Sequence, residues 1–146
     1  MVFFIKTFSE LTNNELYEIL QLRSEVFVVE QNCIYQDLDG KDQKALHVFS
    51  VKDNIIITYT RIFKPGDYFK KASIGRVVVL ESERKNGHGY KLMKKSIEAV
   101  KSRFKVDSVS ISAQVYLKFF YESLGFKKIG DEYLEDGIPH IEMLRD

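Results

Sequence analysis

The chain has 146 residues, of which 45% are hydrophobic and 29% charged, and its formal net charge is +1. These proportions are typical of one globular domain, so we expect a single domain over residues 1–146. The small net charge argues against a general nucleic-acid binder, and no apolar run approaches the ~20 residues of a membrane span. The N-terminus lacks the pattern of a signal peptide and Cys33 is the single cysteine, which together favour a cytoplasmic location.

The N-terminal part predicts a strand over Val2–Phe8 and then a helix. Thr12-Asn13-Asn14-Glu15 is a capping box, in which the threonine hydroxyl and the glutamate carboxylate satisfy free amides of a helix that begins there. The helix is expected to reach about Val29. Arg23 falls on its apolar stripe, so this charge needs a partner, a binding role or a path to the surface.

Residues 30–46 show no periodicity and are predicted to form a loop. An irregular loop of this length is more often functional than filler. It is not a calcium loop, because the Asp-x-Asp-x-Asp-Gly spacing and the terminal glutamate are absent. Leu46–Val51 and Ile55–Phe63 then predict a hairpin around Lys52-Asp53-Asn54, and Lys64-Pro65-Gly66-Asp67 ends it.

The next stretch predicts a strand, an anion-binding turn and a helix. Ala72–Leu80 is expected to be a strand, and its last four residues are continuously apolar, as in a buried strand. A helix is expected from Gly87 to about Phe104, because apolar residues recur there every three or four positions. Between the two lies Arg84-x-x-Gly87-x-Gly89.

We interpret this turn as a pyrophosphate cradle. Free amides at a helix N-terminus favour anions, glycines let phosphate oxygens approach the backbone, and Arg84 and Lys85 add full charges. Taken alone, a Gly-x-Gly sequence is as often only a tight turn. A Walker P-loop would need Lys-Ser/Thr where Tyr90-Lys91 stands, and a Rossmann turn would need a glycine where Leu92 stands.

The remaining elements are, in order, a strand over Ser108–Ser112, a short helix over Gln114–Leu124 ended by Gly125, and strands over Phe126–Gly130 and Ile138–Met143 joined by an acidic loop at Tyr133–Gly137. The whole order is β-α-ββ-β-α-β-α-β-β. It predicts an α/β fold with a mixed sheet and helices on both faces.

Three separated stretches resemble the Gcn5-related N-acetyltransferase (GNAT) superfamily. Besides the turn at residues 84–89, Phe119–Phe126 resembles the Phe-Tyr-x-x-x-Gly-Phe signature. The ElaA-like branch is resembled by Arg23–Gln31, by Tyr35–Asp42 with His47, and by Tyr133–His140. The resemblance implies a single-domain GNAT fold with a mostly antiparallel central sheet. It also implies direct transfer of an acetyl group from acetyl-CoA to an amine of a small molecule or peptide.

The resemblance further implies which residues bind the cofactor: Val77, Val78, Val79, Arg84, Lys85, Asn86, Gly87, His88, Gly89, Tyr90, Gln114 and Tyr121. Gln114 stands where many members have asparagine early in the last helix. Tyr121 is the candidate acid for the leaving thiolate, with a core aromatic residue as the alternative, because it shares a helical stripe with Leu117 and Leu124. A backbone amide at Val77 or its neighbours is the candidate donor to the thioester oxygen.

An amine with a pKa near ~10.4 is protonated at neutral pH, so the reaction needs a base. The candidates are Glu30, Asp37, His47, Glu135 and His140. Arg23, Phe27, Glu30 and Asp37 are expected to line the acceptor pocket, with Arg23 pairing a carboxylate of the acceptor. No metal site is expected, because no tight ligand spacing occurs.

Two other functions stay open at this stage. One is a catalytically inactive acyl-CoA-binding or interaction domain of the same fold. The other is nucleic-acid binding by the basic helix Lys91–Lys105, which acidic flanking segments and the lack of interleaved aromatic residues oppose. We expect no nucleic-acid or membrane partner and a monomer or homodimer, with Tyr68-Phe69 as a candidate dimer contact.

Overall fold

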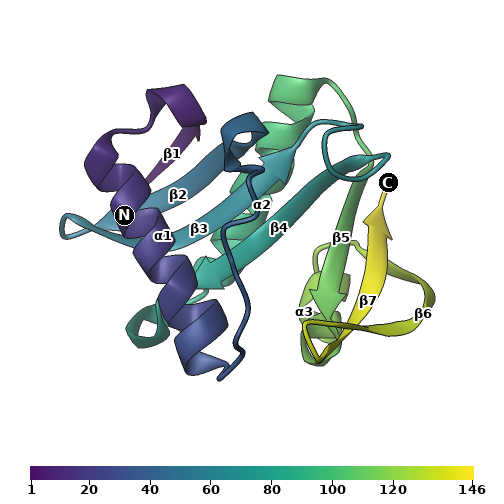
Figure 1. Cartoon of the computed structure of the whole chain (residues 1–146). Helices are drawn as coiled ribbons and strands as arrows, with labels where there is room; N and C mark the ends of the chain where they lie inside the picture. The colour runs from purple at the N-terminus through teal and green to yellow at the C-terminus, as the bar shows by residue number, and fades with distance from the viewer.

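Seven strands form one sheet in the order β1-β2-β3-β4-β5-β7-β6 (Figure 1). The computed structural model describes all of residues 1–146. The strands are β1 (Val2–Thr7), β2 (Leu46–Lys52), β3 (Ile55–Phe63), β4 (Ala72–Val79), β5 (Val109–Gln114), β6 (Lys127–Glu135) and β7 (Ile138–Arg145). Every neighbouring pair is antiparallel except β4 and β5, which are parallel. The predicted mixed, mostly antiparallel sheet is confirmed.

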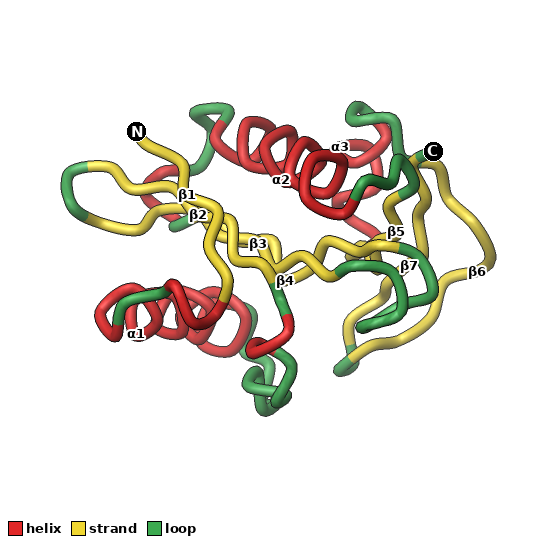
Figure 2. The backbone as a smooth tube through the Cα atoms, turned by 90° about the horizontal axis from the view of Figure 1, so that it is seen from above, coloured by secondary structure: helices red, strands yellow, loops and turns green.

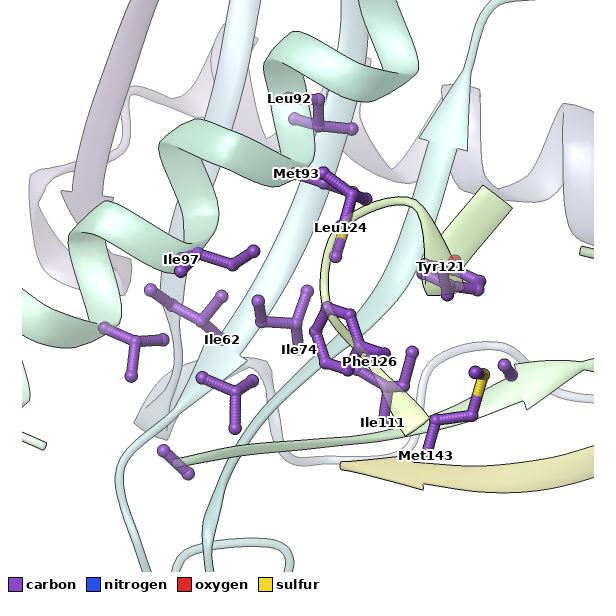
Figure 3. Packing of buried hydrophobic residues seen from close by; sticks show 14 of the residues in the cluster. Ile62, Ile74, Leu92, Met93, Ile97, Ile111, Tyr121, Leu124, Phe126 and Met143 are labelled. Carbon is purple, nitrogen blue, oxygen red and sulfur yellow. The ribbon is translucent and has the colours of Figure 1, made fainter. Parts of the chain in front are cut away.

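Helices cover both faces of the sheet, as predicted. Seen edge-on in Figure 2, α1 (Asn13–Ser24) lies on one face, and α2 (His88–Phe104) and α3 (Lys118–Glu122) lie on the other. A core cluster of 18 buried residues packs between α2, α3 and the sheet, and Figure 3 shows part of it. A second cluster of 7 buried residues packs under α1. None of the helices is long and apolar enough to cross a membrane.

The helix boundaries differ from the sequence prediction in two places. The capping box of α1 forms as expected, since the Glu15 amide donates to the Thr12 hydroxyl at 3.0 Å. Beyond Ser24 the backbone continues as a π-helical turn over Glu25–Glu30. The predicted helix over Gln114–Leu124 is too long, because Gln114 ends β5, where it pairs with His140 of β7.

The predicted acidic loop at Tyr133–Gly137 is wrong in its extent. Asp136 and Gly137 have φ of 52° and 77°, which a two-residue hairpin turn with both central residues at positive φ requires. The strands therefore continue to the turn, with Tyr133 opposite His140 and Glu135 opposite Ile138. This register brings the side chains of Glu135 and His140 onto neighbouring strands.

The strands β4 and β5 pair over only two positions, Ala72 with Val109 and Ser73 with Ser110. Beyond these positions they diverge toward their C-terminal ends, as Figure 1 shows. The unpaired backbone edges of both strands therefore face each other across an opening in the middle of the sheet.

A β-bulge in β4 adds to this opening. Tyr59 of β3 pairs with Val78 and Arg61 pairs with Gly75, so β4 has one residue more than β3 in this interval. Arg76 takes up the extra length with a φ of 49°. Arg76 and Val77 have no partner in the register of either neighbouring strand.

Ion pairs connect the loop after the π-helical turn to α1 and to the sheet. The six residues that form them are Arg23, Asp37, Asp39, Asp42, Arg61 and Arg76. Arg23 pairs with Asp37 and with Asp42, each at 2.8 Å. Arg61 bridges Asp39 at 2.8 Å and Asp42 at 2.9 Å, and Arg76 reaches Asp37 at 2.7 Å. We call these six residues the ion-pair cluster.

The pKa of Asp39 reflects this arrangement. Burial acts to raise it, but hydrogen bonds from Arg61 outweigh burial and lower the pKa of Asp39 to about 2. The pKa of Asp42 is lowered as well, since its burial is outweighed by hydrogen bonds from Arg23 and Arg61, so Asp39 and Asp42 are both charged at neutral pH.

We predict that Asp42→Ala lowers the free energy of unfolding by about 3–5 kcal/mol, because it leaves Arg23 and Arg61 each without one buried partner. Urea denaturation followed by circular dichroism measures this loss. Asp107→Ala is the control, because Asp107 is exposed and this change should stay within about 0.5 kcal/mol. A loss below about 1 kcal/mol for Asp42→Ala would contradict a structural role for the cluster.

Candidate functional site

The divergence of β4 and β5 opens a cleft of about 480 Å³, which we call the main cleft. Eleven of the twelve predicted cofactor-binding residues line it: Val77, Val78, Val79, Arg84, Lys85, Gly87, His88, Gly89, Tyr90, Gln114 and Tyr121. Asn86 lies in the same turn but does not line the cleft. The cleft also includes Phe27 and Glu30 from the π-helical turn.

The turn that opens α2 borders the main cleft with free backbone amides. Gly87 is the N-cap at a φ of 76°, a conformation that glycine adopts without strain. A Cβ placed on Gly89 would lie 3.6 Å from Phe120 and 3.7 Å from Val79, which both line the cleft. The absence of a longer side chain at Gly89 therefore keeps the backbone accessible from the cleft, as an anion site at a helix N-terminus needs.

Arg84 lines the main cleft, and two contacts fix its side chain. Its Nη1 atom lies 2.7 Å from Glu30 Oε2, and its Nε donates to the Val79 carbonyl at 3.1 Å. The guanidinium therefore lines the same cleft as the residues that begin α2. The Glu30 carboxylate is therefore ion-paired with Arg84 within the main cleft.

A smaller cavity of about 100 Å³, the side pocket, adjoins the main cleft. Five residues line both: Phe27, Val77, Gln114, Leu117 and Tyr121. The remaining walls come from β4 with its bulge, from β5, from the β6–β7 hairpin, and from Cys33 and Tyr35 in the loop that follows the π-helical turn. The two cavities therefore meet at Tyr121.

Tyr121 has a buried ring, yet its hydroxyl makes no hydrogen bond to another residue. The ring contacts Phe120 and Phe126 edge-on, with centroid distances of 5.1 and 6.0 Å, and Figure 3 shows it at the edge of the core cluster. Burial raises the pKa of Tyr121 above that of free tyrosine. The phenol therefore keeps its proton at neutral pH and can donate it where the cavities meet.

His140 and Glu135 form a pair in the side pocket. His140 Nδ1 lies 2.7 Å from the Ile138 carbonyl oxygen. A carbonyl oxygen cannot donate, so Nδ1 carries the hydrogen, and Nε2 of the neutral ring has the free lone pair. That Nε2 lies 3.4 Å from Glu135 Oε2, and Ser112 donates to the same carboxylate group at 3.4 Å. The side pocket thus holds the basic Nε2 of His140 next to the carboxylate of Glu135.

Three predicted site residues lie elsewhere. Arg23 and Asp37 line neither cavity and belong to the ion-pair cluster, so their assignment to the acceptor pocket is wrong. His47 is fully buried: its Nε2 donates to the Asp42 carbonyl at 2.9 Å, and its Nδ1 accepts from the Tyr59 hydroxyl at 2.6 Å. Both ring nitrogens are occupied within the core, so the assignment of His47 as the base is wrong.

The structure also adds residues that the sequence did not single out for the site. Cys33, Ser112 and Asp136 line the side pocket, and so does Arg76 of the bulge. The alternation of Ser108–Ser112 indicated a polar face for Ser112, but it did not indicate what that face borders. The bulge at Arg76 has no sequence signal that we recognise.

We predict that stability falls as the pH drops below about 6.5, the pKa of an unfolded histidine, because burial lowers the pKa of His47 in the folded state. Below that pH the unfolded chain binds a proton that the folded chain resists, and the loss continues down to the folded pKa. Urea denaturation at pH 7.5 and 5.5 should show a smaller loss in His47→Gln than in the wild type. An equal loss in both proteins would contradict the assignment to His47.

Comparisons with known proteins agree with this geometry. A family model described as an acetyltransferase (GNAT) domain matches residues 7–145. Protein ElaA of Escherichia coli strain K12 is 44% identical over 140 residues, which are 94% of this chain and 92% of ElaA. A solved acyl-CoA N-acyltransferase from Pseudomonas aeruginosa has a TM-score of 0.94 at 38% identity, and solved E. coli ElaA has 0.92 at 40%, each with full coverage of both chains.

Proposed function

This chain belongs to the acetyltransferase (GNAT) family, in its ElaA-like branch, and is an N-acyltransferase; we propose that it transfers an acetyl group from acetyl-CoA to an amine of a small molecule or peptide. The observation that carries the proposal is the meeting of two cavities at Tyr121. One cavity has the anion-binding turn at its edge, and the other holds the His140–Glu135 pair. A donor and an acceptor can thus approach each other from opposite sides.

The residues of the main cleft fit acetyl-CoA. The unpaired edge of β4 at Val77–Val79 offers backbone groups to the pantetheine arm, and the turn at residues 84–90 offers amides and a guanidinium to the pyrophosphate. The absence of a side chain at Gly89, where a Cβ would contact Phe120 and Val79, supports this fit. The P. aeruginosa relative is an acyl-CoA N-acyltransferase, which favours the same class of donor here.

Acetyl-CoA would supply the thioester carbonyl carbon that the amine attacks, with a C–N bond forming as the C–S bond breaks. As the amine attacks, negative charge would develop on the carbonyl oxygen, and it would return to the carbonyl bond when the thiolate leaves. The backbone amide of Val77, which has no partner in the register with β3, or that of a neighbour in the β4 bulge is the proposed donor to that oxygen. The bulge holds this amide in place before the reaction, so no reorganisation is needed.

Two proton transfers complete the proposal. His140 Nε2 accepts the proton that the amine must lose, because no donor of the protein uses its lone pair, and the neighbouring Glu135 carboxylate stabilises the imidazolium that forms. Tyr121 donates the proton that the departing thiolate gains, because its hydroxyl is neutral and has no partner in the protein. Glu30 is less suited to the base role, because it lies outside the side pocket and is paired with Arg84.

The surroundings of the side pocket favour a cationic acceptor. Glu135 and Asp136 line it, and its arginine, Arg76, is already paired with Asp37.

The unpartnered Tyr121 hydroxyl and the His140–Glu135 pair argue against the other function considered from the sequence, an inactive acyl-CoA-binding domain. We propose a cytoplasmic location on the basis of the single cysteine, Cys33.

We predict that Tyr121→Phe lowers kcat by about 10²-fold while leaving the KM for acetyl-CoA within about twofold, because it removes a proton donor and keeps the ring. Free-thiol release measures turnover, with the best amine from a panel of primary amines and short peptides. Tyr17→Phe is the matched control, since Tyr17 is 72% exposed on α1. Wild-type kcat in Tyr121→Phe, with chemistry shown to be rate-limiting by single-turnover kinetics, would contradict the role of Tyr121 as an acid.

A further inference from the structure

A third cavity of about 60 Å³, the distal cavity, continues the side pocket away from Tyr121. Five residues line both: Ile74, Gly75, Arg76, Ser112 and Glu135. The distal cavity ends at Arg61, Phe63, Tyr68, Phe69 and Ser73. These shared walls place the two cavities side by side along β4, from the level of Val77 to that of Ser73, and we call the two together the groove.

Gly75 lies in the shared wall of this groove. Its φ is not positive, so the backbone does not require glycine there. A Cβ at Gly75 would meet nothing within 4 Å, so close packing does not require glycine either. The missing side chain keeps the groove open between its two ends.

The distal end of the groove combines an apolar surface with unused polar atoms. The Tyr68 ring stacks on Phe63 at 5.1 Å and contacts Phe69 at 4.6 Å, and Tyr68 is 40% exposed. Ser73 Oγ and Arg61 Nε are buried and have no hydrogen-bond partner. A ligand that brings a ring or a large apolar group together with a hydrogen-bonding group suits this end.

The charge and length of the groove limit what it can bind. Carboxylates of Glu135 and Asp136 lie at the reactive end, while the arginines of the groove are paired within the ion-pair cluster. A cationic amine is therefore expected to bind beside Tyr121.

The length of the groove matches a short extended peptide. Val77 and Ser73 are four positions apart on β4, a span of about 13 Å at ~3.3 Å per residue of extended chain.

We propose that the acceptor is a peptide with a free α-amine, bound in extended form along β4, whose third or fourth residue places an aromatic side chain against Tyr68 and Phe69. The proposal rests on the acetyl transfer proposed above and names its acceptor class. The α-ammonium lies near Glu135 and His140. The peptide backbone passes over Gly75, and the distal cavity selects the apolar side chain.

The test compares acetylation of the amides of Gly-Gly-Gly-Phe and Gly-Gly-Phe-Gly with that of tetraglycine amide and glycinamide, by free-thiol release. At least one of the two phenylalanine peptides should have a kcat/KM roughly tenfold above that of tetraglycine amide, which is the selectivity that a small apolar subsite provides. Tyr68→Ala should remove most of that ratio. Lys70→Ala, a change at an exposed residue of the same segment outside the groove, should keep it.

Gly75→Val tests the proposal independently of Tyr68. A side chain in the wall that the two cavities share should lower the ratio of kcat/KM between the phenylalanine peptide and tetraglycine amide. Thermal melts of each variant confirm folding. Turnover of glycinamide with equal kcat/KM for all four acceptors would overturn the peptide proposal and leave the transferase proposal standing. No thiol release with any amine, and no stabilisation by acetyl-CoA, would overturn both.

Discussion

The short pairing of β4 with β5 is the constraint on which the site depends. A parallel pair that continued to Val79 would bury the backbone groups of both strands in a ladder. Pairing stops after Ser73 and Ser110, so beyond these residues the facing edges of the two strands have no partner in each other. The bulge at Arg76 breaks the ladder with β3 as well. The main cleft, the side pocket and the junction at Tyr121 all follow from this one interruption of the sheet.

An interrupted sheet needs support, and the ion-pair cluster supplies it on the face that carries α1. Arg23 comes from α1, Arg61 from β3 and Arg76 from the bulge, and all three bind aspartates of one loop. The loop is thereby fixed beside the groove, and the bulged residue is held at its positive φ. Because buried ion pairs of this kind contribute little net stability compared with apolar packing, we attribute to them the definition of one geometry rather than extra stability.

The sequence predicted the parts of the site that depend on local rules. Gly87 and Gly89 after a β-branched strand indicated the anion-binding turn, and the need of Arg23 for a partner was visible on its helical stripe. The partners were not, because Asp37 and Asp42 lie 14 and 19 residues away in an aperiodic loop. His47 could not be assigned to the core from sequence, because nothing local indicates which residues cover a strand face. The proximity of Glu135 and His140 was open to prediction, since Asp136-Gly137 is a strong hairpin signal. The bulge at Arg76 depends on register across three strands and was not.

The most direct test of the account is a thermal melt with acetyl-CoA, with ATP and NAD as control ligands, on the wild type and on Gly89→Tyr. A ligand at a hundred times its dissociation constant adds about 2.7 kcal/mol to the folded state. We predict stabilisation of the wild type by acetyl-CoA alone and none of Gly89→Tyr, whose ring would enter the main cleft between Phe120 and Val79. Lys91→Tyr, at an exposed position of the same helix, should respond like the wild type. A folded wild type that acetyl-CoA does not stabilise, or an equal shift in Gly89→Tyr, would contradict the placement of the donor in this cleft.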